Sequence, residues 1–224
     1  MNVLLDLDGT LTDPRAGFVA SIRYALQNID CEAPSDDDIA KHIGPPLEET
    51  FAKLLGATRE HQIGAAVNLY RNRYSSTGIF ENAVYEGIPH ALNEIQSFGF
   101  RIYLATSKPQ VFAIRILEHF SLSQFFTAVY GSELDGTRSD KRSLIAYILQ
   151  QESFLPTSAV MVGDRSHDVK GALFNAVSPV GVLWGYGTLA ELTEAGATIF
   201  VEHPSQLAQT LSSNNALKWD GGKR

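Results

Sequence analysis

The sequence predicts an α/β fold: a Rossmann-like, mostly parallel sheet flanked by helices, with an all-helical cap domain inserted into it. Short apolar runs alternate along the chain with segments in which apolar residues recur at helical spacing. This alternation is typical of parallel sheets that are covered on both faces. Between the first and second runs lie more than eighty residues without a convincing strand, too many for a plain crossover, and this indicates an insertion.

The composition is that of a globular protein that binds small molecules. Of the 224 residues, 44% are hydrophobic and 19% are charged, which excludes a disordered or collagen-like chain. The formal net charge is −7, so the chain offers no broad cationic surface to a nucleic acid or an anionic membrane. We therefore expect small-molecule partners, with no nucleic acid and no membrane.

Cysteine usage and the absence of a targeting pattern predict a cytoplasmic location. The single cysteine, Cys31, cannot close an internal disulfide, and the sequence shows neither a signal-peptide pattern nor a long charge-free apolar run. Without a heptad repeat or a long apolar edge, the expected oligomeric state stays open between monomer and homodimer.

Apolar runs too short for a helix predict the core strands. The first run, Val3–Leu7, ends at Asp8-Gly9-Thr10, where the glycine predicts a turn. The later core strands are expected at Arg101–Ala105, Ala128–Tyr130, Ala159–Val162 and Val180–Leu183, with an edge strand at Ala197–Val201.

Proline and glycine boundaries, together with capping pairs, predict the helices of the core. The expected helices are one after Pro89 that stops at Gly99, one after Pro109, one that opens at Lys141, one that begins near Ser166, one capped by Thr188 and Glu191, and a short one at Pro204–Leu211.

Domain boundaries follow from these elements. The expected parts are an α/β core at residues 1–14 and 83–212, a helical cap at residues 15–82, and a frayed tail at residues 213–224. Asp13 and Pro14 are predicted to be the N-cap and the first residue of the first cap helix. Such a cap would act as a lid that excludes water and contacts the substrate, with Arg23, Arg71 and Arg73 among the candidate contacts.

Two carboxylates, Asp6 and Asp8, stand two residues apart where the first strand ends. The two-residue period of a strand sends both to the same side of the sheet. Like charges beside an apolar strand are costly unless a cation lies between them or one of them is protonated. An ordinary Asp-Gly turn would explain Asp8 but not Asp6.

A second acidic pair follows the fourth strand. Asp164 comes directly after Gly163, and Asp168 lies one helical turn later. If the first and fourth strands are neighbours, these acids and the first pair converge on one crevice at the strand ends. Carboxylate and carbonyl oxygens are the ligands of Mg²⁺, and one cysteine with six scattered histidines gives no zinc pattern. The pattern therefore favours a magnesium site.

Candidate anion-binding groups follow the second strand. Thr106, Ser107 and Lys108 precede a helix N-terminus, and hydroxyls and amides in that position suit phosphate oxygens. A simple N-cap would explain Ser107 equally well, whereas the strand-end position of Thr106 favours a phosphate role. Lys141 opens a later helix, where a cation opposes the helix dipole unless it faces an anion. Taken alone, it would be a typical surface lysine.

In order along the chain, these segments resemble the four motifs of the haloacid dehalogenase-like hydrolase superfamily. The matching segments are Asp6-Leu7-Asp8-Gly9-Thr10, Thr106, Lys141 and Gly163-Asp164-Arg165-Ser166-His167-Asp168. The match covers almost the whole chain. Within the superfamily the chain resembles the phosphoglycolate phosphatase-like branch with a helical cap, and parts of it are similar to members described as 5′-nucleotidase-like.

The resemblance implies a phosphatase, a phosphoric monoester hydrolase that acts on a small phosphorylated metabolite. Asp6 would be the nucleophile that becomes an aspartyl phosphate, and Asp8 would be the general acid and base. Thr106, Ser107 and Lys141 would bind the transferring phosphoryl oxygens, and Lys141 would also offset the charge of Asp6.

The resemblance also implies the cofactor Mg²⁺. Asp6, the Asp8 carbonyl and Asp164 would hold the ion, with Asp168 supporting from nearby. A phosphoglycolate phosphatase, a 5′-nucleotidase and a sugar phosphomutase stay open as alternatives, and so does a catalytically silent module that binds a phosphorylated ligand or a partner protein. A dehalogenase is disfavoured, because displacement of a halide leaves no alkoxide for Asp8 to protonate.

Overall fold

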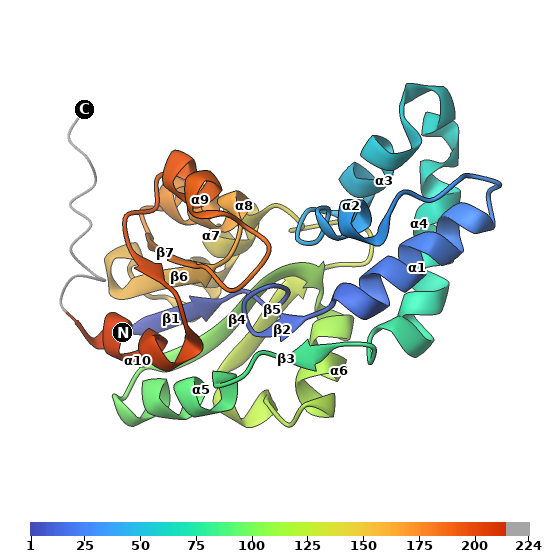
Figure 1. Cartoon of the computed structure of the whole chain (residues 1–224). Helices are drawn as coiled ribbons and strands as arrows, with labels where there is room; N and C mark the ends of the chain where they lie inside the picture. The colour runs from blue at the N-terminus through green and yellow to red at the C-terminus, as the bar shows by residue number, and fades with distance from the viewer. Residues whose placement is uncertain (214–224) are drawn as a thin grey trace. The chain divides into compact units, whose positions relative to one another are not determined.

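Six parallel strands form one sheet in the order β5-β4-β1-β6-β7-β8 in the computed structural model, which describes residues 1–213 (Figure 1). The predicted fold class is confirmed. The strands are β1 (Asn2–Leu5), β4 (Arg101–Pro109), β5 (Ala128–Ser132), β6 (Ala159–Gly163), β7 (Ser178–Val182) and β8 (Phe200–Val201).

Helices cover both faces of this sheet. They are α5 (Ile88–Ser97), α6 (Gln110–His119), α7 (Lys141–Glu152), α8 (Ser166–Phe174), α9 (Leu189–Ala195) and α10 (Leu207–Ser212), with 3₁₀ turns at Ser123–Phe125, Pro156–Ser158 and Pro204–Gln206. Figure 1 shows α7 and α8 on one face and α5 and α6 on the other. The buried side chains of Leu4, Tyr103 and Met161 form the core under α7, where they meet Leu144 and Ile148. No helix within residues 1–213 combines the length and apolar composition that a bilayer crossing requires.

The strand order reverses at β1, and this places the site. Leu5 of β1 pairs with Leu104 of β4 on one side and with Val162 of β6 on the other. The first and fourth predicted strands are therefore neighbours, as the convergence of the acids requires. Ligand sites in open parallel sheets lie at the carboxyl ends of the strands where the order reverses.

The strand β4 is longer than expected. It was predicted to end at Ala105 but continues to Pro109, so Thr106 and Ser107 lie in the strand instead of a loop. Its register with β5 shifts from Ala105 opposite Tyr130 to Pro109 opposite Ser132. The chain therefore bulges at this point, and local propensity does not reveal such a shift, because pairing with β5 imposes it.

The chain divides into two compact units, Asp13–Ala83 and the remainder, which comprises Met1–Thr12 and the chain from Val84 onward. The expected boundaries were residues 15 and 82. At the two crossings, β2 (Thr12–Asp13) and β3 (Ala83–Val84) pair as a two-stranded sheet. The expected tail at residues 213–224 lies outside the described residues, apart from Ser213.

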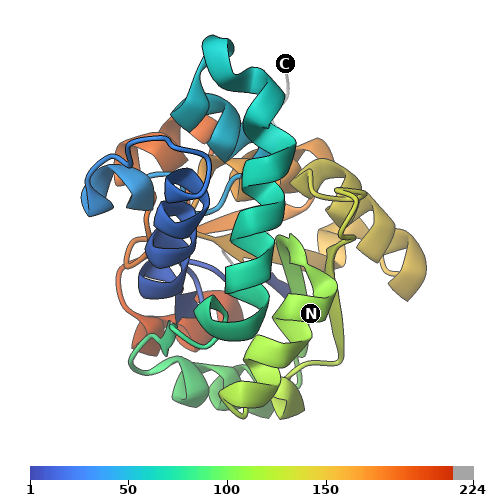
Figure 2. The same cartoon turned by 90° about the vertical axis from the view of Figure 1, so that its right-hand side faces the viewer.

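The Asp13–Ala83 unit is helical between those two crossings. It contains α1 (Arg15–Gln27), α2 (Asp36–Ala40), α3 (Leu47–Leu55) and α4 (Ile63–Arg73), a 3₁₀ segment at Ala57–Gln62 and a π-helical turn at Tyr74–Gly78. Figure 2 shows α1 and α4 side by side. Tyr70 is the centre of their packing, because its ring lies 5.9 Å from that of Phe18 and 5.1 Å from that of Tyr74.

The predicted start of α1 was wrong by one position. Pro14 occupies the N-cap and Arg15 is the first helical residue. Asp13 still accepts a hydrogen bond from the Arg15 N–H at 2.9 Å. The Asp13 carboxylate therefore caps a free N–H of the helix from the position before the N-cap. The sequence pattern alone does not distinguish this Asx-type contact from an N-cap.

The three cap arginines named as candidate substrate contacts have partners inside their own unit. Arg73 pairs with both carboxylate oxygens of Glu81 at 2.8 and 3.0 Å. Arg23 lies 2.6 Å from Asp36, and Arg71 lies 3.3 Å from Glu48. Each of the three arginines therefore has a carboxylate partner within the Asp13–Ala83 unit.

Candidate active site

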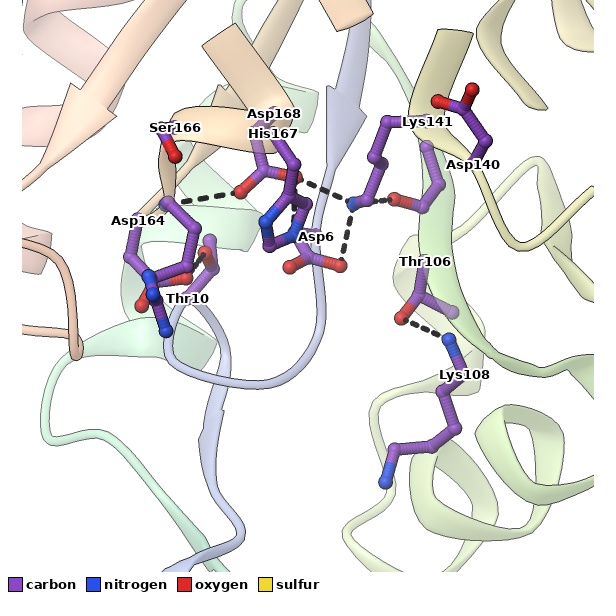
Figure 3. A network of polar contacts seen from close by, with 12 residues as sticks. Asp6, Thr10, Thr106, Lys108, Asp140, Lys141, Asp164, Ser166, His167 and Asp168 are labelled. Atoms are coloured by element: carbon purple, nitrogen blue, oxygen red, sulfur yellow. Dashed lines mark hydrogen bonds and ion pairs between the residues drawn. The ribbon is translucent and has the colours of Figure 1, made fainter. Parts of the chain in front are cut away.

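Lys141 joins the ends of two strands and a helix. Its ammonium lies 2.8 Å from Asp6 Oδ1 and 2.7 Å from Asp168 Oδ1, and it donates to the Ala105 carbonyl at 2.6 Å (Figure 3). The side chain is almost completely buried, with 2% of the residue exposed. Asp140 caps the helix by accepting from the Arg142 N–H, and this fixes the backbone from which Lys141 extends. A residue typical of a surface is thus the central cation of the site.

Asp6 lies one residue beyond β1 and is held by the neighbouring strand, because its N–H donates to the Val162 carbonyl at 3.0 Å. Burial raises the pKa of Asp6 to about 7, an effect that Lys141 opposes and Asp168 reinforces. Burial alone would lower the pKa of Lys141, but Asp168 and Asp6 raise it above its ordinary value. The lysine therefore stays charged and favours the carboxylate form of Asp6.

Asp164 and Asp168 come from β6 and its continuation into α8. Asp168 accepts the Arg165 N–H at 3.1 Å as well as pairing with Lys141. Asp164 accepts the Tyr186 N–H at 2.8 Å and is 3.4 Å from the Thr10 hydroxyl. Burial, followed by the charges of Asp168 and Asp6, raises the pKa of Asp164 well above its ordinary value. This carboxylate therefore lies in a place where a cation would stabilise its ionised form.

Asp8 has a cationic partner that the sequence analysis did not assign. Lys108 Nζ lies 3.0 Å from Asp8 Oδ2, and the two side chains are only 9% and 15% exposed. Lys108 was recognised only as part of the segment after the second strand. No local pattern marks this contact, because it joins the end of β4 to the turn after β1, about a hundred residues apart in the sequence.

Thr106 and Ser107 extend the site along β4. Thr106 is buried, and its hydroxyl accepts the Lys108 N–H at 3.2 Å. Figure 3 shows Thr106 beside Lys108, on the same side of the view as Lys141. The Ser107 carbonyl accepts the hydroxyl of Ser132 from β5 at 2.9 Å. These contacts hold the segment internally and to β5, and the phosphate roles of the two hydroxyls stay predictions.

His167 is a further member that the sequence analysis left without a role. One atom each from Asp6, His167 and Asp168 lie within 4.8 Å of one another, a spacing that could hold a metal ion. The Lys141 ammonium already contacts both acids of this group. Burial lowers the pKa of His167, so the imidazole is neutral at neutral pH. Because the Lys141 ammonium lies between Asp6 and Asp168, it fills the position that a metal ion would need in this group.

The residues around Asp164 fit a hard divalent cation. Lys141 contacts Asp6 and Asp168, and Lys108 contacts Asp8. The charges of Asp168 and Asp6 help to raise the pKa of Asp164, so a cation beside Asp164 would relieve this repulsion. Within residues 1–213, the buried Oδ1 of Asp8 has no hydrogen-bond partner. An oxygen donor set with uncompensated charge is what Mg²⁺ requires.

Comparisons with known proteins identify the family. The family profile described as haloacid dehalogenase-like hydrolase matches residues 3–182. A 5′-nucleotidase from Pseudomonas aeruginosa is 42% identical over 213 residues, which are 95% of this chain and 96% of that protein. The tyrosine-protein kinase PtkA from Mycobacterium tuberculosis is 42% identical over 207 residues, 92% of this chain and 69% of that protein.

A solved structure gives the same result for the fold. The crystal structure of a predicted phosphatase from Clostridium acetobutylicum is 39% identical, with a TM-score of 0.89 over 94% of this chain and 97% of that one. The family match spans both strands that carry the acids and the lysine between them. The chain is therefore an enzyme of the haloacid dehalogenase-like hydrolase family, and it belongs with the phosphatases of that family.

Proposed function

We propose that the chain is a Mg²⁺-dependent phosphatase that hydrolyses a small phosphomonoester through an aspartyl phosphate on Asp6. The observation that carries the proposal is the buried contact of Lys141 with Asp6 and Asp168 at the carboxyl end of β1. A lysine within 2.8 Å keeps a buried carboxylate available as a nucleophile. It also reduces the repulsion that an anionic phosphate would meet.

In the first step, the Asp6 carboxylate attacks phosphorus, and the bond from phosphorus to the leaving oxygen breaks. Asp8 enters this step protonated and gives its proton to that oxygen, so the alcohol departs neutral. In the second step, Asp8 takes a proton from a water molecule as that water attacks phosphorus. The bond between phosphorus and Asp6 then breaks, inorganic phosphate leaves, and Asp6 and Asp8 return to their initial states.

The other residues hold the phosphoryl group. Lys141 and the hydroxyls of Thr106 and Ser107 would bind its oxygens and stabilise the charge that spreads over them in the transition state. We assign Mg²⁺ to Asp6, the Asp8 carbonyl and Asp164. Asp168, the second carboxylate that contacts Lys141, would support the metal site from nearby. When bound there, the ion would neutralise phosphate charge and bring the substrate to the nucleophile.

For the substrate we favour a nucleoside 5′-monophosphate. The support is the 5′-nucleotidase that is 42% identical over nearly the full length of both chains. Three proteins described as phosphoglycolate phosphatase, from Aquifex aeolicus, Colwellia psychrerythraea and Vibrio parahaemolyticus, are 21–23% identical. Phosphoglycolate is therefore the second substrate to test.

The similarity to the tyrosine kinase PtkA supports a second candidate function. Its identity to this chain is 42%, the same as that of the 5′-nucleotidase, over 69% of its own length instead of 96%. An aspartyl phosphate can pass its phosphoryl group to a hydroxyl instead of water, provided that the acceptor excludes water from the site. Both functions would pass through an aspartyl phosphate on Asp6. A phosphatase would form it from a phosphomonoester and release an alcohol, whereas a kinase would form it from ATP and release ADP. They also differ in the acceptor, so the donor and the product separate them.

Release of inorganic phosphate tests the proposal. The purified chain is assayed with p-nitrophenyl phosphate, nucleoside 5′-monophosphates, phosphoglycolate and hexose phosphates, each with Mg²⁺ or with EDTA. We expect Mg²⁺-dependent release, fastest from a nucleotide. A shifted phosphate on an intact sugar would identify a phosphomutase, and ATP-dependent labelling of a tyrosine peptide would identify a kinase. No turnover of any substrate would favour a silent binding module.

A further inference from the structure

A segment distant in sequence from the four motifs packs directly on Asp164. Residues 184–187 (Trp184, Gly185, Tyr186 and Gly187), which we call the 184–187 loop, follow β7 and belong to the same unit as the site. The Tyr186 N–H donates to Asp164 Oδ2 at 2.8 Å. A backbone donor is thus aimed at one oxygen of the carboxylate that we assign to the metal.

The loop approaches so closely that two of its residues have no room for a side chain. A Cβ on Gly185 would lie 2.4 Å from Asp164 Oδ2 and 2.3 Å from the Gly9 carbonyl oxygen. A Cβ on Gly187 would lie 1.8 Å from the Asp164 carbonyl oxygen. Gly9, with a φ of 85°, closes the other side, because its Cβ would lie 2.2 Å from Asp164 Oδ2. Glycines from two separate loops therefore enclose one carboxylate.

The same loop is tied to the turn that follows the nucleophile. The indole Nε1 of Trp184 donates to the Thr10 carbonyl at 2.9 Å. The Thr10 hydroxyl in turn lies 3.4 Å from Asp164 Oδ1. Each oxygen of Asp164 therefore has its own donor, and the loop and the turn are fixed to each other as well as to the acid.

We propose that the 184–187 loop is a positioning element that sets the affinity of the site for Mg²⁺ by fixing the orientation of the Asp164 carboxylate. The inference rests on the proposed function, which assigns Mg²⁺ to Asp164. None of the loop side chains supplies a metal ligand in this assignment. The loop acts through the Tyr186 N–H and through close backbone packing, and residues that orient a ligand are typically worth about 10- to 100-fold in metal affinity.

Substitution of a single glycine tests the loop. Gly187→Ala is compared with Gly64→Ala, because a Cβ on Gly64 meets no atom within 4 Å. The melting temperature is measured against Mg²⁺ concentration, since an ion that binds the folded state raises it. We expect the half-saturating Mg²⁺ concentration to rise about ten-fold in Gly187→Ala and to stay unchanged in Gly64→Ala. At saturating Mg²⁺, the kcat of Gly187→Ala should be within about three-fold of the wild-type value, because the substitution leaves the reacting groups intact.

If Gly187→Ala fails to fold, Trp184→Phe tests the same proposal. This variant removes the indole N–H that donates to the Thr10 carbonyl and keeps an aromatic ring. We expect its half-saturating Mg²⁺ concentration to rise at least three-fold, a smaller change than that expected for Gly187→Ala. A folded variant that melts earlier but keeps the wild-type Mg²⁺ response would overturn the positioning role. A wild-type protein that hydrolyses phosphomonoesters with no response to Mg²⁺ would overturn the metal assignment and this inference together.

Discussion

Among single residues, Lys141 is the one whose removal should harm both stability and chemistry. Replacement by Met would leave Asp6 and Asp168 buried beside each other without a cation. Breaking a buried pair in this way costs about 3–5 kcal/mol. We therefore expect Lys141→Met to lower the free energy of unfolding by about that amount in urea titrations and to abolish phosphate release.

The matched control is Lys41→Met. Lys41 also pairs with an aspartate, Asp38 at 2.6 Å, but both side chains are more than half exposed. Exposed pairs contribute about 1 kcal/mol or less, so this variant should unfold almost as the wild type does. Equal stability of Lys141→Met and Lys41→Met would contradict the description of Lys141 as the central cation.

The acid role of Asp8 is tested by the leaving group. Asp8→Asn keeps the shape of the side chain but has no proton to give to a departing alkoxide. We expect a loss of about 10²- to 10⁴-fold in kcat on alkyl phosphates, and a much smaller loss in the first step on p-nitrophenyl phosphate, whose anion leaves readily. Equal losses on both substrates in single-turnover measurements would show that Asp8 does not act as the acid.

Lys108 should influence the reaction through Asp8. Its ammonium lies 3.0 Å from Asp8 Oδ2, so Lys108→Met frees the carboxyl group to rotate. We expect kcat on alkyl phosphates to fall by about ten-fold, with a smaller effect on p-nitrophenyl phosphate. Lys108→Arg, which keeps the charge, should recover part of the rate. A loss in Lys108→Met that does not depend on the leaving group would contradict the proposed link to Asp8.

At the scale of elements, Glu191 connects the N-terminus of α8 to α9. It accepts the Ser166 N–H at 2.8 Å and pairs with Arg165 at 3.1 Å. Burial alone would raise the pKa of Glu191, but the Ser166 N–H and Arg165 lower it below its ordinary value. A carboxylate with a depressed folded pKa stabilises the protein above its unfolded pKa, and this contribution is lost as the pH falls through the folded pKa.

We therefore expect Glu191→Gln to destabilise the protein by about 1 kcal/mol at pH 7, because the side chain is partly exposed. The difference from wild type should shrink as the pH falls below about 4.5. Glu194→Gln, at an exposed position of the same helix, is the control and should change little. Urea titrations at pH 7 and pH 4 give the comparison, and a difference that grows in acid would contradict the assignment.

Some elements could be predicted from the sequence and others could not, for physical reasons. The core strands are local apolar runs, so β1 and β6 were recognisable, and their adjacency brings the acids together. The extension of β4 to Pro109 depends on pairing with β5. The contact of Lys108 with Asp8 and the packing of the 184–187 loop on Asp164 join segments distant along the chain, and no local pattern marks them.

At the scale of the whole molecule, the periodicity of apolar residues was sufficient to predict the fold class. It indicates which face of each helix or strand is buried, and those faces determine how the layers pack. The net charge of −7 means that an anion would have to be held by local cations, and the two lysines in the site are such cations. Lys141 shows why a single residue can mislead: its burial depends on Asp6 and Asp168. The lid role of the Asp13–Ala83 unit stays a prediction.

The central claim is that Asp6 carries the phosphoryl group between the two steps. The most direct measurement is acid quenching of the enzyme during turnover, followed by mass spectrometry of its peptides. We predict one added phosphoryl group on the peptide that contains Asp6, with both the adduct and the turnover lost in Asp6→Asn. A phosphoryl group on another residue, or an Asp6→Asn variant that hydrolyses phosphomonoesters at a rate near that of the wild type, would contradict the account.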